Sequence, residues 1–173
     1  YVNRNLQVSN KYSNRLSILS LDLGTNTGWA LMKKDGNIVS GTHNFSLRRG
    51  YGRGRRFLLF RQFLNNLYDE HGEITHVYYE QVMHHSGIVA AHIYGGFYGI
   101  LMYWCEALEI IYTGITPTSI KKFITGSGKA DKDMVIQSVK KLGFSPKDDN
   151  EADALALLHL AMDDLGIMTN KTE

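Results

Sequence analysis

The chain has 173 residues, 43% of them hydrophobic and two of them proline, a length that suits one domain with a sheet and packed helices. Its only cysteine, Cys105, excludes an internal disulfide and a cysteine-based zinc cage, and the lack of a run of about 18 apolar residues predicts no membrane-spanning helix. The formal net charge of +2 conceals an asymmetry, with eleven Lys/Arg against two acids up to Arg61 and eight against fifteen after it. A polyanion can therefore bind the first part while carboxylates elsewhere gather metal ions, although such charges also simply solvate a surface.

The two ends of the chain differ from its middle. Residues 1–14 are polar and aperiodic, so we expect a flexible N-terminal arm, a single domain over residues 15–168 and a tail at 169–173. No signal-peptide pattern is visible. The single cysteine favours a reducing compartment.

Residues 16–22 are the first strong structural signal and predict a buried strand that ends on Asp22. Gly24 and Gly28 bracket a tight turn, after which a second strand returns antiparallel. A carboxylate at the end of a buried strand is costly unless a metal ion, a hydrogen-bond donor or a proton compensates its charge. Asp22 is therefore a candidate metal-holding or phosphate-facing acid, and the alternative is an exposed residue at a hairpin tip.

A loop rich in arginine and glycine follows a third strand, residues 38–45, which completes an antiparallel meander. Glycine lets this loop, residues 46–56, fit an irregular surface, and guanidinium groups match phosphate oxygens. We therefore expect contact with DNA or RNA, whereas a solvated linker is the alternative. The candidate contact residues are Arg48, Arg49, Arg53, Arg55 and Arg56.

Helices and strands then alternate. Residues 57–68 have helical spacing of apolar positions, residues 76–80 predict a fourth strand that again ends on a carboxylate, and residues 88–108 predict a long helix. Small residues recur every four positions along one face of that helix, which favours close packing within the monomer or a helix-to-helix dimer contact. These residues are Ala91, Gly95 and Gly99.

The remainder predicts a fifth strand at residues 110–115 and three helices, at 118–124, 130–142 and from 148 or 149 to 165. Thr116 and Pro117 suit the start of the first of these helices. The order of elements predicts an α/β fold with a mixed five-stranded sheet. Its first three strands are antiparallel, the later strands run parallel to the first, and helices cover both faces.

Four carboxylates are expected to meet in this fold. The first and fourth strands would lie side by side, which makes Asp22 and Glu80 neighbours, and Asp149 and Asp153 share one face of the last helix. Clustered oxygen ligands suit Mg²⁺ or Mn²⁺, and two such ions can hydrolyse a phosphodiester. Stabilisation by the helix dipole is an alternative role for Asp148 and Asp149, but it explains Asp22 and Glu80 poorly.

Four short motifs occur in order along residues 16–165. They are Asp22-x-Gly24, Glu80-Gln81-Val82, Gly126-Ser127-Gly128-Lys129-Ala130-Asp131-Lys132 and Asp153-Ala154-Leu155-Ala156. Together they resemble RuvC-type Holliday junction resolvases, which have the RNase H-like fold of the retroviral-integrase superfamily. The compact form and divergent loops look more like viral or phage members than cellular ones.

The resemblance implies a homodimer that cuts four-way DNA junctions, each subunit nicking one of two opposed strands. It implies Mg²⁺, with Mn²⁺ as a substitute, at two ions per active site, and neither a nucleotide cofactor nor a membrane partner. The expected compartment is the cytoplasm, that of the bacterial host if the protein is from a phage. The long helix matches the family's dimer helix, with Ala91, Gly95 and Gly99 at the interface.

By position, Asp22, Glu80 and Asp153 match the family's metal-binding catalytic acids. Bacterial members place the fourth acid three residues before the last one, which here is the neutral Asn150. Other members place it four residues before, which here is Asp149, and we favour Asp149. Two neighbouring acids are further candidates, Asp148 and Glu151.

Lys121 and Lys132 match family lysines near the scissile phosphate, where a cation offsets developing charge, and Lys129 is a candidate backbone contact. Met83 stands where bacterial members insert an aromatic wedge at the junction centre, and this departure puts base-sequence preference in doubt. The other candidates for opening the junction are His84 and His85.

Two other functions fit parts of the sequence. A related nuclease of this fold could act on branched, flap or replication-fork DNA. Residues 22–28 also resemble the first phosphate loop of actin-like ATP-binding domains, but the chain has no second such loop and lacks the length for two domains.

Overall fold

The computed structural model describes residues 16–167, so the predicted arm, the tail and the exact domain limits at 15 and 168 lie outside the described residues. The strands are β1 Ile18–Asp22, β2 Asn26–Met32, β3 Ile38–Asn44, β4 His76–Glu80 and β5 Ile111–Ile115. The helices are α1 Arg55–His71, α2 Ile88–Ala107, α3 Pro117–Thr125, α4 Lys132–Lys141 and α5 Asp149–Asp164.

The strands form one sheet in the order β3-β2-β1-β4-β5. The pairs β1–β2 and β2–β3 are antiparallel, whereas β4 runs parallel to β1 and β5 parallel to β4. This topology confirms the predicted mixed sheet. It places the first strand at the centre, so that a side chain at the end of β1 has neighbours on both sides.

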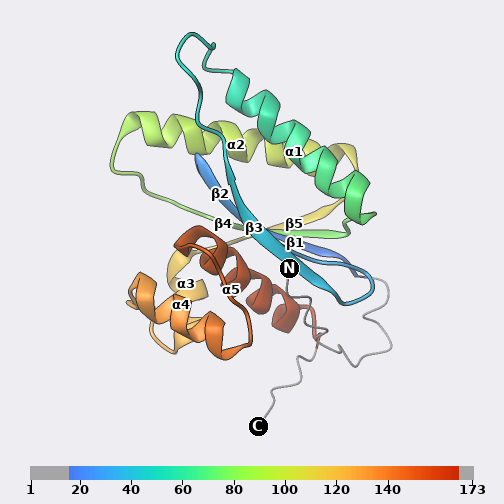
Figure 1. Ribbon diagram of the computed structural model, residues 1–173, viewed down its shortest axis with the longest axis vertical. Helices are drawn as coiled ribbons and strands as arrows, with labels where there is room; N and C mark the ends of the chain where they lie inside the picture. Colours follow the sequence, from blue (N-terminus) through green and yellow to red (C-terminus); the bar gives the residue numbers. More distant parts are fainter. Residues whose placement is uncertain (1–15, 168–173) are drawn as a thin grey trace.

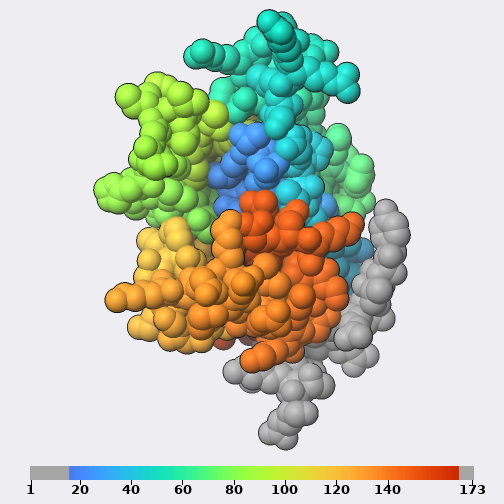
Figure 2. All heavy atoms as spheres, turned by 60° about the vertical axis from the view of Figure 1, so that its left-hand side comes forward, coloured from blue at the N-terminus to red at the C-terminus, as the bar shows by residue number. Residues whose placement is uncertain are grey.

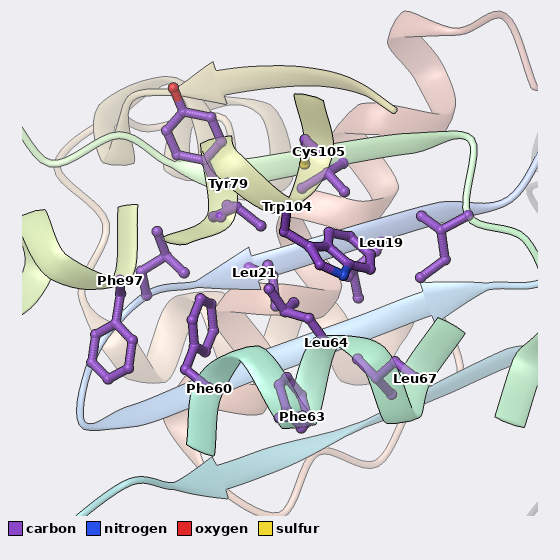
Figure 3. Packing of buried hydrophobic residues seen from close by; sticks show 14 of the residues in the cluster. Leu19, Leu21, Phe60, Phe63, Leu64, Leu67, Tyr79, Phe97, Trp104 and Cys105 are labelled. Carbon is purple, nitrogen blue, oxygen red and sulfur yellow. The ribbon is translucent and has the colours of Figure 1, made fainter. Parts of the chain in front are cut away.

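Side chains alternate between the two faces of the sheet and build two cores. Leu19 and Leu21 of β1 point to one face, where they pack with Phe60, Phe97 and Trp104 from α1 and α2 (Figure 3). Residues on the other face, among them Ile18, pack against α3, α4 and α5. Figure 1 shows this division, with α1 and α2 on one side of the sheet and the three C-terminal helices on the other.

Local capping fixes where the C-terminal helices begin. Thr116 accepts a hydrogen bond from the Ser119 N–H and Pro117 opens α3, as predicted. The Asp131 carboxylate caps α4 by accepting from the Met134 N–H, so this helix starts at residue 132 rather than at the predicted 130. A capping carboxylate requires extended backbone at its own residue, which ends the preceding loop there.

Helix α2 is the most apolar helix of the described chain. By length and composition, it alone among the helices of residues 16–167 could cross a membrane. This differs from the sequence-based expectation, because a mean over a window tolerates the histidine, the glutamate and the tyrosines that interrupt the apolar run. One such helix is weak evidence for a membrane.

Candidate active site

Two carboxylates leave the sheet side by side, where the parallel strands β1 and β4 end. Leu21 pairs with Tyr79 in their register, so Asp22 and Glu80 follow at the same edge, as expected. The turn after Asp22 is closed by the Thr27 hydroxyl, which donates to the carbonyl of Gly24 at 2.7 Å. Figure 2 shows the β1–β2 segment, in blue, reaching the surface between the start of α2 in green and the C-terminal helices in orange.

The first turns of α5 bring two more carboxylates to this edge. Asp149 and Asp153 are one helical turn apart, and both lie close enough to Asp22 to raise its pKa. The Lys132 ammonium, at the start of α4, forms an ion pair with Asp149. The hydrogen bond within this ion pair lowers the pKa of Asp149 and raises the pKa of Lys132. The structure thus places all four predicted acids at one edge of the sheet, with Lys132 beside Asp149.

Burial is the main cause of the altered proton affinities at this edge. It raises the pKa of Asp22 well above its usual value, and the negative charges of Glu80, Asp153 and Asp149 raise it further. Burial and then Asp153 raise the pKa of Glu80 to about 7. Burial and then Asp149 raise the pKa of Asp153 to about 6. The site therefore holds more negative charge than its surroundings compensate.

Two neighbouring acids, the N-cap Asp148 and Glu151, dock α5 onto the edge strand β3. Thr42 donates its hydroxyl proton to Asp148 at 2.6 Å, and Ser40 donates to Glu151 at 2.7 Å. The second oxygen of Glu151, a side chain only 5% exposed, accepts from the Lys147 N–H. The structure does not support Asp148 or Glu151 as the fourth acid, because their oxygens serve this docking. Sequence reasoning missed both hydroxyl partners.

The start of α5 also lies directly against β2. A Cβ atom built on Gly28 would lie 1.9 Å from the carbonyl oxygen of Asn150, far inside van der Waals contact. Only glycine therefore lets the helix approach closely enough to bring its acids to Asp22. Asn150, the neutral alternative for the fourth acid, meets the sheet through its main chain.

The three candidate lysines differ in their surroundings. Lys121 of α3 lies close enough to Glu80 and Asp153 to lower the pKa of both. Lys132 contacts the acids through Asp149. Lys129 is exposed in the turn before α4, where its main-chain N–H donates to the Ser127 hydroxyl. The structure brings Lys121 and Lys132 to the carboxylates and leaves Lys129 on the surface.

The loop after Glu80 is held by a tyrosine that sequence reasoning missed. The Tyr94 hydroxyl of α2 donates to the carbonyl of Glu80 at 2.8 Å and accepts from the Val82 N–H at 3.1 Å. Beyond this brace Met83 is 68% exposed and His84 is also exposed. The ring of His85 instead packs against Tyr94. Met83 and His84 are therefore free to meet a ligand, and His85 contributes to the brace.

The arginine-rich loop borders the same end of the sheet. Its exposed arginines are Arg48, Arg49, Arg53 and Arg55. Helix α1 begins at residue 55, so the last two arginines belong to this helix rather than to the loop. Arg56 is half-buried and donates from Nη1 to the Thr25 hydroxyl at 3.4 Å, three residues after Asp22. The start of α1, where the loop ends, is thereby tied to the turn that follows the first acid.

With this geometry in view, residues 18–160 match the family model of the crossover junction endodeoxyribonuclease RuvC. The chain belongs to the RuvC family. The RuvC of Dictyoglomus turgidum is 28% identical over 152 residues, which cover 81% of this chain and 92% of that protein. The RuvC of the Wolbachia of Brugia malayi is 31% identical over 150 residues, covering 81% and 90%. RuvC membership leaves the actin-like ATP-binding alternative without support.

Solved structures show the same fold. Thermus thermophilus RuvC in complex with a Holliday junction substrate matches with a TM-score of 0.72 at 17% identity, covering 88% of this chain and 98% of that one. The yeast mitochondrial Holliday junction resolvase Ydc2 matches with a TM-score of 0.58 at 15% identity, covering 81% and 75%. This likeness to RuvC confirms the predicted RNase H-like sheet.

RuvC enzymes are metal-dependent nucleases, and the donor set of this site fits a hard divalent cation. The half-buried carboxylates of Glu80, Asp153 and Asp149 lie close to Asp22 with too little positive charge nearby, and a cation would relieve their mutual repulsion. Within residues 16–167, however, no three acidic, histidine or cysteine side chains are close enough to hold an ion together. Asp149 is engaged by Lys132 instead. Asp22, Glu80, Asp153 and Asp149 are the residues that would hold such a cation.

We expect the metal-free protein to lose stability as the pH rises from about 4 to about 7. Folding raises the pKa of Glu80 from 4.5 to about 7 and that of Asp153 from 3.8 to about 6. The folded state therefore binds these protons more tightly than the unfolded chain, and this stabilisation is lost as the pH rises through 6 and 7. Thermal unfolding in EDTA across this range measures the effect, and Mg²⁺ should raise Tm more at pH 8 than at pH 5.

The variant Glu80→Gln isolates the contribution of this carboxylate from that of all other acids. Its Tm should match the parent at about pH 4, where Glu80 is largely protonated in both the folded and the unfolded chain, and exceed it by a few degrees at pH 8 without metal. Equal pH profiles for variant and parent would contradict the assignment of this pKa.

Proposed function

We propose that this chain is a structure-specific DNA endonuclease that resolves four-way junctions by metal-dependent hydrolysis of phosphodiester bonds, and that it acts as a homodimer. The observation that carries the proposal is the meeting of four carboxylates at the ends of β1 and β4 and the start of α5, in a chain of the RuvC family. RuvC relatives are crossover junction endodeoxyribonucleases, and one solved relative holds a Holliday junction.

The roles of the residues follow from their places. Asp22, Glu80, Asp153 and Asp149 would hold two Mg²⁺ ions, or Mn²⁺ in their place. The ions, when bound, would activate a water molecule and stabilise the leaving oxygen of a phosphodiester. Lys121 and Lys132 lie at the same acids, where their charges would attract a scissile phosphate and offset the negative charge that develops on it.

A basic surface beside the site supports DNA as the substrate. The arginine-rich loop is exposed and tied to the turn after Asp22, so a phosphate backbone bound there lies next to the carboxylates. We propose phosphate contacts from the arginines of the loop and from Lys129, and contacts at the branch point from Met83 and His84.

The decisive experiment compares cleavage of a four-way junction, a Y-shaped DNA and a linear duplex of matched sequence in Mg²⁺. Symmetric nicks in two opposed strands of the four-way junction support the proposal. Faster cleavage of the Y-shaped DNA favours the alternative, a nuclease for flaps or replication forks. Equal cleavage of the linear duplex overturns junction specificity. Binding should weaken steeply with salt because phosphate contacts dominate affinity.

The exposed face of α2 supports the homodimer. Ile88 and Val89 are 75% and 72% exposed, large apolar side chains whose burial in a partner is favourable. Cβ atoms built on Gly95 and Gly99 would meet nothing within 4 Å, so these glycines leave open space along the helix. Ala91 lies on the same face one turn earlier. A second copy of α2 fills such a face.

We expect Gly95→Leu to break the dimer while leaving the monomer folded. The new side chain meets no atom of its own chain, and replacing glycine in an exposed helix interior stabilises the helix by about 1 kcal/mol. Light scattering should then report a monomer, with Tm unchanged or higher. Gln137→Leu on the exposed face of α4 is the control and should stay dimeric. A dimeric Gly95→Leu variant that makes symmetric nicks would place the interface elsewhere.

A further inference from the structure

The arginine-rich loop carries one aromatic residue, Tyr51, whose surroundings differ from those of a core tyrosine. Its side chain is 54% exposed, whereas Tyr78 and Tyr79 in the sheet are 3% and 5% exposed. The Arg55 guanidinium lies over the ring, 5.5 Å from its centroid. A planar cation therefore backs the ring while more than half of the side chain remains open to a ligand.

The loop holds this tyrosine in place through its own turns. The Tyr51 N–H donates to the Arg48 carbonyl at 3.3 Å, and the Arg55 N–H donates to the Gly52 carbonyl at 2.9 Å. Gly50 has a φ of +95°, a conformation that a residue with a Cβ rarely adopts. These turns place the tyrosine and the arginine together on the outside of the molecule. Figure 2 shows this part of the chain, in teal, projecting above the blue β1–β2 segment.

The charge around Tyr51 matches a polyanion. No Asp or Glu occurs between Asp35 and Asp69, and none of the arginines at 48–56 forms an ion pair with any acid of residues 16–167. Arg56 anchors the end of the loop to the turn after Asp22. A nucleic acid held by these guanidinium groups would therefore bring its bases to Tyr51.

We propose that Tyr51, backed by Arg55, is a stacking platform for an unpaired nucleobase at the branch point of the DNA. In a continuous duplex both faces of each base are already covered by neighbouring bases, so a side chain finds no free face. Unpaired bases and the terminal pairs of a branch do offer one. Tyr51 is thus a determinant of selectivity for branched over linear DNA. This inference rests on the proposed function and adds the feature of the substrate that is recognised.

The first test is a set of binding measurements with the full chain, without divalent ions so that the DNA stays intact. Tyr51→Ala should weaken binding to a four-way junction by about tenfold, whereas Tyr51→Phe keeps the ring and should stay within about twofold of the parent. Affinity for a linear duplex should not change. The slope of log K against log salt should be unchanged in Tyr51→Ala and smaller by about 0.9 in Arg53→Gln if that arginine binds one phosphate.

The second test observes the contact directly. In Tyr51→Trp the added indole fluorescence should be quenched by a four-way junction much more than by a linear duplex. Ile111→Trp, 60% exposed in the parent and at the opposite end of the parallel strands, is the control and should not respond.

The results separate this inference from the proposed function. Two outcomes would overturn the stacking platform. Tyr51→Ala could weaken binding of junction and duplex equally, or a junction could bind Tyr51→Trp without quenching its fluorescence. Neither outcome affects the proposed function if the parent cuts the junction. A parent that neither binds nor cuts a four-way junction overturns both.

Discussion

Asp22→Asn is expected to abolish cleavage of a four-way junction while junction binding persists. The substitution keeps the size of the side chain and removes the charge of the most buried acid of the site, the one on which the other three acids act. Because the charge is required only for the chemistry, kcat should fall by about 10³-fold or more, with the Kd for the junction within about threefold. Single-turnover cleavage and a binding assay with the same junction measure the two effects.

A stability measurement excludes misfolding as the cause. Removing a buried charge that its neighbours repel should raise Tm in the absence of metal, so an inactive Asp22→Asn variant would be more stable than the parent. Asp163→Asn, exposed near the far end of α5, is the matched control and should cut at the parental rate. A fully active Asp22→Asn variant would remove Asp22 from the mechanism.

The same cleavage and binding assays test whether Asp149 is the fourth metal ligand. Glu80→Gln and Asp153→Asn should behave as Asp22→Asn does. Asp149→Asn additionally frees Lys132 from its ion pair. A loss of activity of similar size would establish Asp149 as a fourth ligand, and a loss below about tenfold would show that three acids suffice.

Gly28→Ala is expected to be severely damaging although it adds only one methyl group. The added Cβ would lie 1.9 Å from the Asn150 carbonyl oxygen, which is main chain and cannot rotate away, so β2 or α5 must shift. Overpacking against backbone costs about 3 kcal/mol, which lowers Tm by about 10 °C in a protein of this size. The shift also moves Asp149 and Asp153 away from Asp22, and a displacement of about 1 Å reduces the rate by about 10²-fold.

Gly24→Ala is the matched control for stability, because its Cβ would have no neighbour nearer than the Asn26 carbonyl oxygen at 3.6 Å, an ordinary contact. Its Tm should stay within about 2 °C of the parent. Should Gly28→Ala unfold at the parental temperature and cut at the parental rate, the close approach of α5 to β2 would not be required for the site.

The periodicity of the sequence was sufficient to predict the fold and the places of the acids in it. Strand and helix patterns give the order of elements, and that order makes β1 and β4 parallel neighbours, which brings Asp22 to Glu80. Helical spacing does the same for Asp149 and Asp153. Each of these relations depends on a repeat within one element or on one rule for connecting strands.

The contacts that orient the catalytic helix could not be predicted in this way. Ser40 and Glu151 are 111 residues apart, and nothing in either short segment shows that the hydroxyl of one will meet the carboxylate of the other. The hydrogen bond from the Tyr94 hydroxyl to the Glu80 carbonyl likewise joins two segments whose sequences do not show that they will meet. Such pairings are set by how whole layers pack, and a single sequence carries no local pattern for them.

The edge strand β3 holds α5 through Ser40 and Thr42, and it continues past Asn44 directly into the arginine-rich loop. One short strand therefore joins the loop for which we propose DNA contacts to the helix that carries Asp149 and Asp153. Substitutions that bend β3 should raise KM and lower kcat together, whereas those in the loop alone should act on KM. KM and kcat should therefore change together for substitutions within β3, and KM alone should change for substitutions beyond its end.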